Sequence, residues 1–259
     1  MVKGLYTAYT GMLNEQNRMD IMTNNLANAS TVGYKKEGST SQSFDDVLTV
    51  KIKDQSVGMR NAQRIGIKNP GVKIGENYTD YSQGSFRITG NTYDLALSGE
   101  GFFAIEFTNK AGETATKYTR AGQFTLNKDG YLVTEEGDYV LDTQNRRIRL
   151  NTLIDSSITD DGTIYQNGQA MAKIQVTDFA DYDYLEKYGE TYYQPIQGAQ
   201  TIASNAQVKS GYLEMANVQI VSEMVNLISI TRAYESNQKV VQTIDDTLDV
   251  AVNQIGRIQ

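Results

Sequence analysis

The first thirty or so residues carry a hydrophobic stripe that returns at every seventh position. Its members are Leu5, Met12, Met19 and Leu26. Polar residues fill the positions between them, and this alternation predicts an amphipathic helix that needs a partner helix. Asn28 and Ser30, which are poor residues for a helix interior, follow the stripe. We therefore expect the helix to end there.

A second stripe, with the same spacing, occupies the C-terminal part of the chain. Its members are Ile220, Leu227, Tyr234, Val241, Leu248 and Ile255, and Met224 widens it. A helix of about 40 residues would be about 60 Å long, which is more than a compact domain of this size needs. A heptad pattern sustained over this length is typical of a coiled coil.

Between the two stripes the hydrophobic period changes from seven to two. From about Val72 to Gln207, short alternating segments are separated by turn sequences such as NKDG at 127–130, EEGD at 135–138 and QNGQ at 166–169. Short strands at this spacing predict an antiparallel β domain. The segment 34–71 is polar and weakly periodic, which indicates an extended connector.

These patterns predict an α+β protein in three parts. Long N- and C-terminal helices, in 1–33 and 209–259, would pair as a coiled-coil-like module. An antiparallel β-rich domain, in 72–208, would be inserted between them, with 34–71 as the connector. A broad stripe on both termini is hard to bury in one intramolecular pair, and a repeated heterologous contact between copies would produce a helical filament.

The composition narrows the chemistry that such a protein can perform. The 259 residues include no Cys and no His, which excludes disulfides and thiolate metal sites and removes the commonest general base. The net charge is −7 and the basic residues are scattered, which argues against nucleic-acid binding. No apolar run is long enough to span a membrane, and the N-terminus lacks a cleavable secretory signal.

Two short motifs resemble ligand sites but fit turns better. The segment Gly99–Ala104 reads G-x-G-x-x-A, yet an alternating strand pattern follows it where a dinucleotide site needs a helix. Asp160, Asp161 and Gly162 resemble part of a calcium loop but lack the other ligand positions. We expect no cofactor, no metal and no catalytic residue, although a carboxylate pair of the glycosidase type stays open.

An aromatic cluster lies near the end of the predicted β domain. Its members are Tyr182, Tyr184, Tyr188, Tyr192 and Tyr193. Tyrosines favour interfaces, so the cluster could bind sugar or protein, or it could pack on its own domain. An alternative hypothesis therefore makes this chain a secreted glycan binder or hydrolase with a helical stalk.

Several blocks of the sequence, in order, resemble flagellar rod and hook proteins. NNLANASTVGYKK at 24–36 is similar to the signature that follows the first helix of that family. Further similar blocks are GVKIG at 71–75, YSQGSFRITGNTYDLALSGEGFFAIE at 81–106, YTRAGQFTLNKDGYLVTEEGDYVLD at 118–142 and SGYLEMANVQIVSEMVNLISITRAYESNQKVVQT at 210–243. The length resembles rod members, since hook members carry larger inserts. One departure is Thr231, where the family usually has Gln before Arg-Ala-Tyr-Glu.

The resemblance implies a structural, non-catalytic subunit of the flagellar basal-body rod, the hollow axial drive shaft that joins motor to hook. It implies a distal rod position, with the proximal-rod paralogue or a hook-type subunit as alternatives. The implied partners are copies of itself, other rod subunits, the hook protein and ring proteins. The implied location is the basal body outside the cytoplasmic membrane, reached through the flagellar type III export apparatus.

Two sets of residues follow as the candidate sites. The helical interface between subunits comprises the two stripes named above, from Leu5 to Leu26 and from Ile220 to Ile255, together with Met224. The joint, where an inner-tube helix would continue into the outer layers, comprises Asn24, Asn25, Asn28, Gly33 and Tyr34. Its asparagines are expected to bond helix-end carbonyls and neighbouring subunits.

Overall fold

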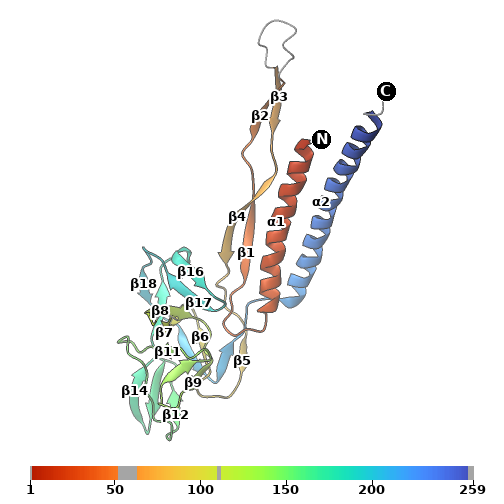
Figure 1. The fold of residues 1–259 in the computed structure, drawn as a ribbon. Helices are drawn as coiled ribbons and strands as arrows, with labels where there is room; N and C mark the ends of the chain where they lie inside the picture. Colours follow the sequence, from red (N-terminus) through yellow and green to blue (C-terminus); the bar gives the residue numbers. More distant parts are fainter. Residues whose placement is uncertain (1, 52–62, 110–111, 256–259) are drawn as a thin grey trace. The chain divides into compact units, whose positions relative to one another are not determined.

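The computed structural model describes residues 2–51, 63–109 and 112–255, and it confirms an α+β fold (Figure 1). Two long helices, α1 (Val2–Ala27) and α2 (Ile220–Ile255), precede and follow all the strands along the sequence. Both helices cover their predicted stripes. The helix α2 has 36 residues and is therefore about 54 Å long, slightly shorter than predicted.

The chain divides into two compact units, which are described separately. The helical unit comprises Met1–Leu26, Glu37–Asp80 and Ile220–Gln259, and the β-rich unit comprises Ala27–Lys36 and Tyr81–Gln219. The backbone therefore passes from one unit to the other four times, after Leu26, Lys36, Asp80 and Gln219. The predicted division into inner tube, connector and outer domain concerns the assembled rod and stays a prediction.

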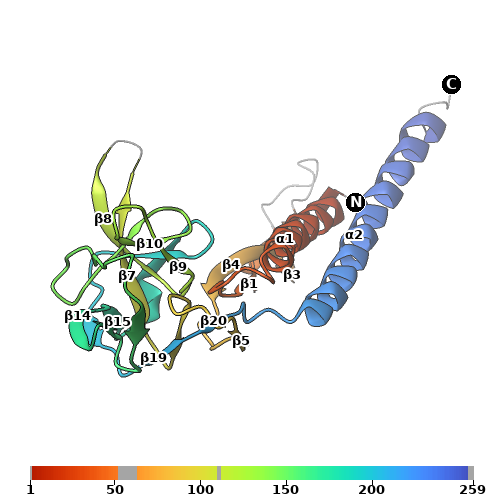
Figure 2. The ribbon, with the colours of Figure 1, turned by 90° about the horizontal axis from the view of Figure 1, so that it is seen from below.

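The helical unit joins the two helices to a pair of β-ladders. Its strands are β1 (Glu37–Ser43), β2 (Val47–Lys51), β3 (Gln63–Lys68) and β4 (Val72–Thr79). β1 pairs with β4 and β2 with β3, in both cases antiparallel. Figures 1 and 2 both show β1 and β4 beside α1. The ladder partners within 37–68 were not foreseen, because this polar segment has no clear period of two.

The β-rich unit is built on one large antiparallel sheet. Its strands are β5 (Phe86–Ile88), β6 (Leu95–Ser98), β7 (Phe102–Thr108), β8 (Thr114–Thr119), β9 (Phe124–Leu126), β10 (Leu132–Thr134), β11 (Tyr139–Val140), β12 (Ser156–Ile158), β13 (Thr163–Gln166), β14 (Gln169–Lys173), β15 (Val176–Phe179), β16 (Leu185–Tyr188), β17 (Tyr192–Pro195), β18 (Thr201–Ala203), β19 (Gln207–Ser210) and β20 (Tyr212–Glu214), with a short 3-10 helix at Tyr182–Tyr184. The large sheet has the order β16-β17-β8-β7-β11-β10-β9, and β15 pairs with β7 and β18. The last two strands of the unit pair with its first two strands, since β19 pairs with β6 and β20 pairs with β5.

Strand β7 separates two hydrophobic cores. Phe103 packs on one face with Leu95, Phe124 and Val208, and Phe102 packs on the other with Phe179. Alternate side chains of a strand point to opposite faces, so the predicted period of two is confirmed here even though both faces are buried. The two cores fix the sheet from both sides.

The predicted turns are confirmed where the backbone requires unusual angles. Asn167 and Gly168 connect β13 to β14 with φ values of 50° and 77°, as an Asn-Gly hairpin turn demands. Gly99 and Gly101, with φ of 117° and 135°, form the turn between β6 and β7. The glycine motif at 99–104 is therefore a strand connection.

Candidate subunit interface and chain junction

The predicted interface stripe on α2 is only partly covered within one chain. Leu227, Tyr234, Val241 and Leu248 are half-buried, whereas Ile220 and Met224 are exposed at 46% and 48%. The side chain of Ile255 lies outside the described residues. On α1 the predicted residues Leu5, Met12, Met19 and Leu26 are all half-buried. Both stripes therefore keep apolar surface available, and their role between subunits stays a prediction.

Helices α1 and α2 approach each other in antiparallel directions. A side-chain carbon built on Gly4 would lie 3.5 Å from Ile244 Cδ1, and one built on Gly11 would lie 3.0 Å from Asn237 Nδ2. The contacts advance along α1 as they move back along α2, which defines the direction. The glycines allow this approach because they have no side chain.

A second face of α1 is held by polar contacts to the β1–β4 ladder. Asn14 Oδ1 accepts a bond of 3.1 Å from the Ser41 hydroxyl. Asn25, which is fully buried, donates to the Glu37 carbonyl at 2.7 Å and accepts from the Glu37 amide at 2.9 Å. The predicted joint residue Asn25 therefore ties the helix to the first strand.

The Asn25 contacts lead to a test within the helical unit. Asn25→Ala should lower the free energy of unfolding by about 2 kcal/mol, because it removes a fully buried amide and both of its hydrogen bonds to the Glu37 backbone. Chemical denaturation followed by helical circular dichroism measures this change. Asn24→Ala, at an exposed position one residue earlier, serves as the control. Equal effects of the two substitutions would contradict the conclusion that the Asn25 side chain ties α1 to the first strand.

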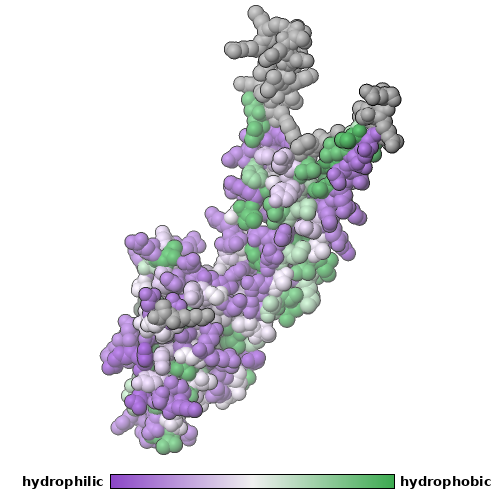
Figure 3. Space-filling view, in the orientation of Figure 1, coloured by the Kyte–Doolittle hydropathy of each residue, from purple (hydrophilic) through white to green (hydrophobic). Residues whose placement is uncertain are grey.

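A third face of α1 and a separate face of α2 remain apolar and exposed. Tyr6, Tyr9 and Leu13 on α1 are exposed at 62%, 52% and 44%. On α2 the exposed set is Val221, Met224, Val225 and Ile228. In both helices these residues recur at intervals of three, four and seven, so each set lies on one face. Figure 3 shows hydrophobic residues at the surface along the helices.

The joint motif continues into the β-rich unit after α1 ends. Asn28 Nδ2 donates to Glu190 Oε2 at 2.7 Å, and its Oδ1 accepts from the Thr31 hydroxyl at 3.1 Å. Gly33 has φ of 70°, and a side chain there would collide with the backbone of Ala121. The Thr31 amide donates to the Asn28 carbonyl in a backbone turn at the helix end. The expectation that the joint asparagines bond helix-end carbonyls and neighbouring subunits stays a prediction.

Tyr34, the last predicted joint residue, is fully buried in the same unit. The ammonium of Lys187 lies 4.3 Å from the centroid of the Tyr34 ring, a cation–π contact. The segment 27–36 is therefore anchored to the β-rich unit through the side chains of Asn28 and Tyr34 and through the backbone at Gly33.

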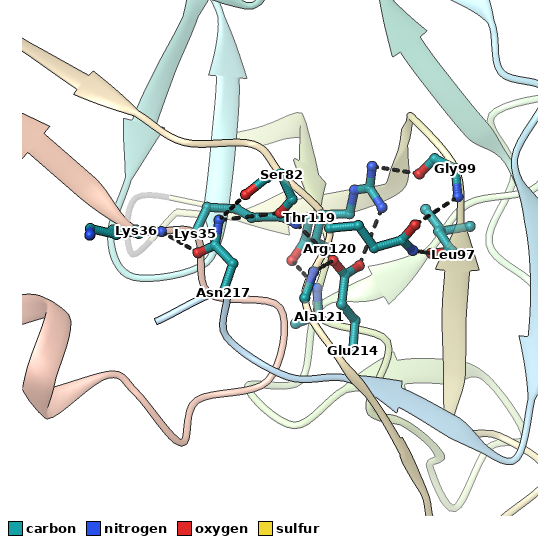
Figure 4. A network of polar contacts seen from close by, with 12 residues as sticks. Lys35, Lys36, Ser82, Leu97, Gly99, Thr119, Arg120, Ala121, Glu214 and Asn217 are labelled. Atoms are coloured by element: carbon teal, nitrogen blue, oxygen red, sulfur yellow. Dashed lines mark hydrogen bonds and ion pairs between the residues drawn. The ribbon is translucent and has the colours of Figure 1, made fainter. Parts of the chain in front are cut away.

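A buried ion network centred on Glu214 holds the same segment (Figure 4). Lys35 Nζ lies 2.7 Å from Glu214 Oε1, and Arg120 Nη1 lies 3.2 Å from Oε2. The Gly84 amide donates to Oε1 at 3.0 Å. Glu214 is fully buried, and the Lys35 and Arg120 side chains are exposed by only 1% and 4%. We name this set the Glu214 network.

Backbone contacts extend the Glu214 network across five parts of the sequence. Lys35 donates to the Ser82 carbonyl at 2.7 Å, and Arg120 Nη2 donates to the Gly99 carbonyl at 2.8 Å. The Gly33 amide donates to the Glu214 carbonyl at 2.8 Å. Sequence reasoning missed this network because Lys35 and Glu214 are 179 positions apart, and the family-like blocks that contain them do not show which residues they contact.

The tyrosine cluster packs largely on its own unit. Tyr192 and Tyr193 are buried, and the Tyr192 hydroxyl donates to Asp138 Oδ2 at 2.9 Å. Tyr182 donates to Asp178 Oδ1 at 2.8 Å. Burial, and then contact with these carboxylates, raises the pKa of both Tyr182 and Tyr192 above the usual value. These contacts favour a structural role for the cluster over a binding face.

Thr231, the departure from the usual family residue, is accommodated inside α2. Its hydroxyl donates to the Leu227 carbonyl, one turn earlier, at 2.8 Å. Among the described residues, no group of His, Cys, Asp or Glu side chains is placed to hold a metal ion. In the part of the chain that the structure describes, neither helix has the length and hydropathy of a membrane span.

Three family models match different parts of the chain. A model described as "flagella basal body rod protein" matches residues 5–35, and one described as "flagellar hook protein FlgE/F/G D1 domain" matches 96–168. A model described as "flagellar basal body rod FlgEFG protein C-terminal" matches 209–255. The first and last models cover the helices and the joint, and the second covers the centre of the β-rich unit.

Curated proteins match over nearly the whole chain. The flagellar basal-body rod protein FlgG of Bacillus subtilis is 34% identical over 98% of this chain and 99% of its own length. The flagellar hook-basal body complex protein FlhO of the same organism is 32% identical over the full length of both. The flagellar basal-body rod protein FlgF of Caulobacter vibrioides is 31% identical, also over both full lengths.

Proposed function

Because this chain belongs to the flagellar basal-body rod protein family, and is a structural subunit of the rod in the basal body, we propose that it polymerises through its two terminal helices. The family is one of structural proteins rather than enzymes. Its members assemble with other rod and hook subunits, and the proposal concerns how this chain does so.

The observation that supports the proposal is the pair of exposed apolar faces on α1 and α2. The face on α1 consists of Tyr6, Tyr9 and Leu13. The face on α2 consists of the exposed residues Val221, Met224, Val225 and Ile228. The first set lies on a different side of α1 from the glycines that approach α2. One copy cannot cover both faces by itself, whereas a second copy can. A contact between two different faces is heterologous, and it extends as a helical filament when its rotation does not close into a ring.

We propose that the half-buried stripes contribute to the same assembly. Leu227, Tyr234, Val241 and Leu248 would form a coiled-coil-like seam with α1 residues such as Met12, completed by neighbouring copies. Ile220, Met224 and Ile255 would extend the seam at both ends of α2. The joint residues Asn24 and Asn28 would contact neighbouring subunits where the inner tube meets the outer layers.

The proposed layers follow the three parts predicted from the sequence. The helical module, residues 1–33 and 209–259, would form the inner tube, 34–71 the connector and 72–208 the outer domain. We propose the distal rod as its place, supported by the relatives named FlgG, with the proximal position as the alternative, supported by the relative named FlgF. The hook protein and ring proteins would be further partners, and export would use the flagellar type III apparatus.

A single charge on the exposed face of α2 tests the proposal. Val225 is exposed at 60%, so Val225→Asp should leave the monomer folded. In the assembled contact the new carboxylate would be buried, which is unfavourable. A cost of about 1.4 kcal/mol per contact already lowers an association constant tenfold. The number of flagella per cell should therefore fall by at least about tenfold. Flagella are counted by electron microscopy in a strain that expresses only the variant.

The control is Gln238→Asp, which adds the same charge at an exposed polar position of the same helix. Thermal unfolding of both purified variants verifies that their monomers are equally stable. Normal flagellar numbers in the Val225→Asp strain would exclude this face as an assembly surface.

A further inference from the structure

Two grooves on the described part of the β-rich unit have similar volumes and opposite charge. The first, which we name the acidic groove, has a volume of about 540 Å³, and its charged lining residues are Glu135, Glu136, Glu190 and Arg87. The second, the basic groove, has a volume of about 530 Å³, and its charged lining residues are Lys128, Arg149 and Asp129. Carboxylates therefore outnumber cations in the first, and cations outnumber carboxylates in the second.

The two grooves lie at opposite ends of one buried strand. Lys128 is in the turn that precedes β10, and Glu135 and Glu136 are in the turn that follows it. The first two residues of β10, Leu132 and Val133, are exposed by 0% and 8%, so the strand is a fixed part of the core. The strand holds the two grooves apart, so the basic groove of one copy cannot enter its own acidic groove.

The charged groups in both grooves are placed to meet a partner. Glu135, Glu136, Lys128 and Arg149 are exposed, and none of the ion pairs among the described residues involves them. The Arg149 guanidinium lies 5.6 Å from the Tyr131 ring and its Nε donates to the Asp129 carbonyl at 3.3 Å. These contacts orient the guanidinium while leaving its terminal nitrogens for a carboxylate.

The acidic groove is also continuous with the joint. Asn28 and Thr31 line it, and Asn28 holds Glu190 through the bond of 2.7 Å. The hydroxyl of Tyr192, another lining residue, is bonded to Asp138, which fixes the ring at the groove. The groove is therefore lined by residues from five separate parts of the sequence, namely 28–32, 87, 121–123, 134–136 and 190–192.

We propose that the acidic groove of one subunit binds the basic groove of a second copy of this chain, in a head-to-tail contact between β-rich units. The inference rests on the proposed polymerisation and adds a second, polar contact to it. Charge complementarity identifies the occupant, because both partner surfaces are on the same chain. The two surfaces differ, so the contact is heterologous and, where its rotation does not close into a ring, repeats as the open helical array that a rod requires.

A charge-reversal experiment tests the contact in cells that lack the native protein. One variant carries Glu135→Lys and Glu136→Lys, and the other carries Lys128→Glu and Arg149→Glu. Each variant alone brings like charges together at every contact, so the number of flagella per cell should fall by at least about tenfold. When both variants are expressed together, each reversed groove faces a complementary groove on the other chain. Flagella should then return to more than half of the wild-type number.

The matched control reverses one charge of each sign outside the grooves, with Glu113→Lys and Lys173→Glu, both at exposed positions. It should leave the number of flagella unchanged. Normal assembly of either single-groove variant would overturn the proposal, and so would failure of the two folded variants to restore assembly together. Thermal unfolding verifies the folding of each variant. Neither result bears on the proposed polymerisation through the helices, because the Val225→Asp variant tests that contact separately.

Discussion

Replacing Glu214 by alanine is expected to lower the free energy of unfolding of the β-rich unit by about 3–5 kcal/mol, because breaking a buried ion pair leaves an uncompensated charge. Lys35 and Arg120 would both lose their carboxylate partner while exposed by no more than 4%. The Gly84 amide would lose its acceptor as well. The unfolding midpoint should fall by about 10 °C, measured by near-ultraviolet circular dichroism of the β-rich unit's tyrosines.

Two further variants make the Glu214 prediction specific. Glu113→Ala removes an exposed carboxylate from the same unit and should change the free energy of unfolding by less than about 0.5 kcal/mol. Combining Glu214→Ala with Lys35→Met should recover part of the loss, because it removes one of the stranded cations. A Glu214→Ala protein as stable as the wild type would show that the network contributes no stability.

Gly33→Ala is the second substitution with a large expected effect, a loss of about 3 kcal/mol or more. The residue has φ of 70°, where a side chain alone costs about 1–2 kcal/mol. The new methyl group would also collide with the backbone of Ala121, which cannot rotate away as a side chain could. The Gly33 amide bond to the Glu214 carbonyl would have to lengthen as the segment shifts.

Gly137→Ala separates the two causes of the Gly33 effect. Gly137 has φ of 97°, and a side chain there would have no neighbour within 4 Å. This control should therefore lose only the backbone contribution, about 1 kcal/mol. Chemical denaturation of the three proteins under the same conditions gives the comparison. A loss at Gly33 no greater than at Gly137 would exclude the collision with Ala121 as a cause.

The helices and turns were predictable from the sequence because their signals are local. Leu5 to Leu26 repeats at seven residues and lies within α1, and the α2 stripe from Ile220 to Ile255 has the same bounds as the helix. Asn167-Gly168 has the backbone angles that its sequence demands. In each case neighbouring residues carry the information, so no knowledge of distant contacts is needed.

The strand β1 of the helical unit was harder to predict because the contacts that hold it to α1 are not hydrophobic. The strand Glu37–Ser43 reads EGSTSQS and has only one buried residue, Gly38, over which the Tyr78 ring lies. Asn14 and Asn25, on α1, supply the hydrogen bonds that hold it. A pattern of hydrophobic residues cannot reveal a strand that is held by amide groups.

Most of the junction and both grooves depend on contacts between distant residues. Glu214 is 94 positions from Arg120 and 179 positions from Lys35, and each of the three resembles an ordinary surface charge in the sequence. The family signature marked the Asn24–Tyr34 region as important without showing what it contacts. The structure supplies the reason, since Tyr34 and the adjacent Lys35 are buried and contact Lys187 and Glu214 from the later part of the chain.

The four passages of the backbone between the two units have a mechanical consequence. Domains joined by one linker can swivel about it, which is the default expectation for multidomain chains. Here the connections after Leu26, Lys36, Asp80 and Gln219 act in parallel. A torque applied to one unit would therefore be carried by four covalent connections rather than by one. In a subunit of a rotating shaft, such a topology would oppose twist more than a single linker would.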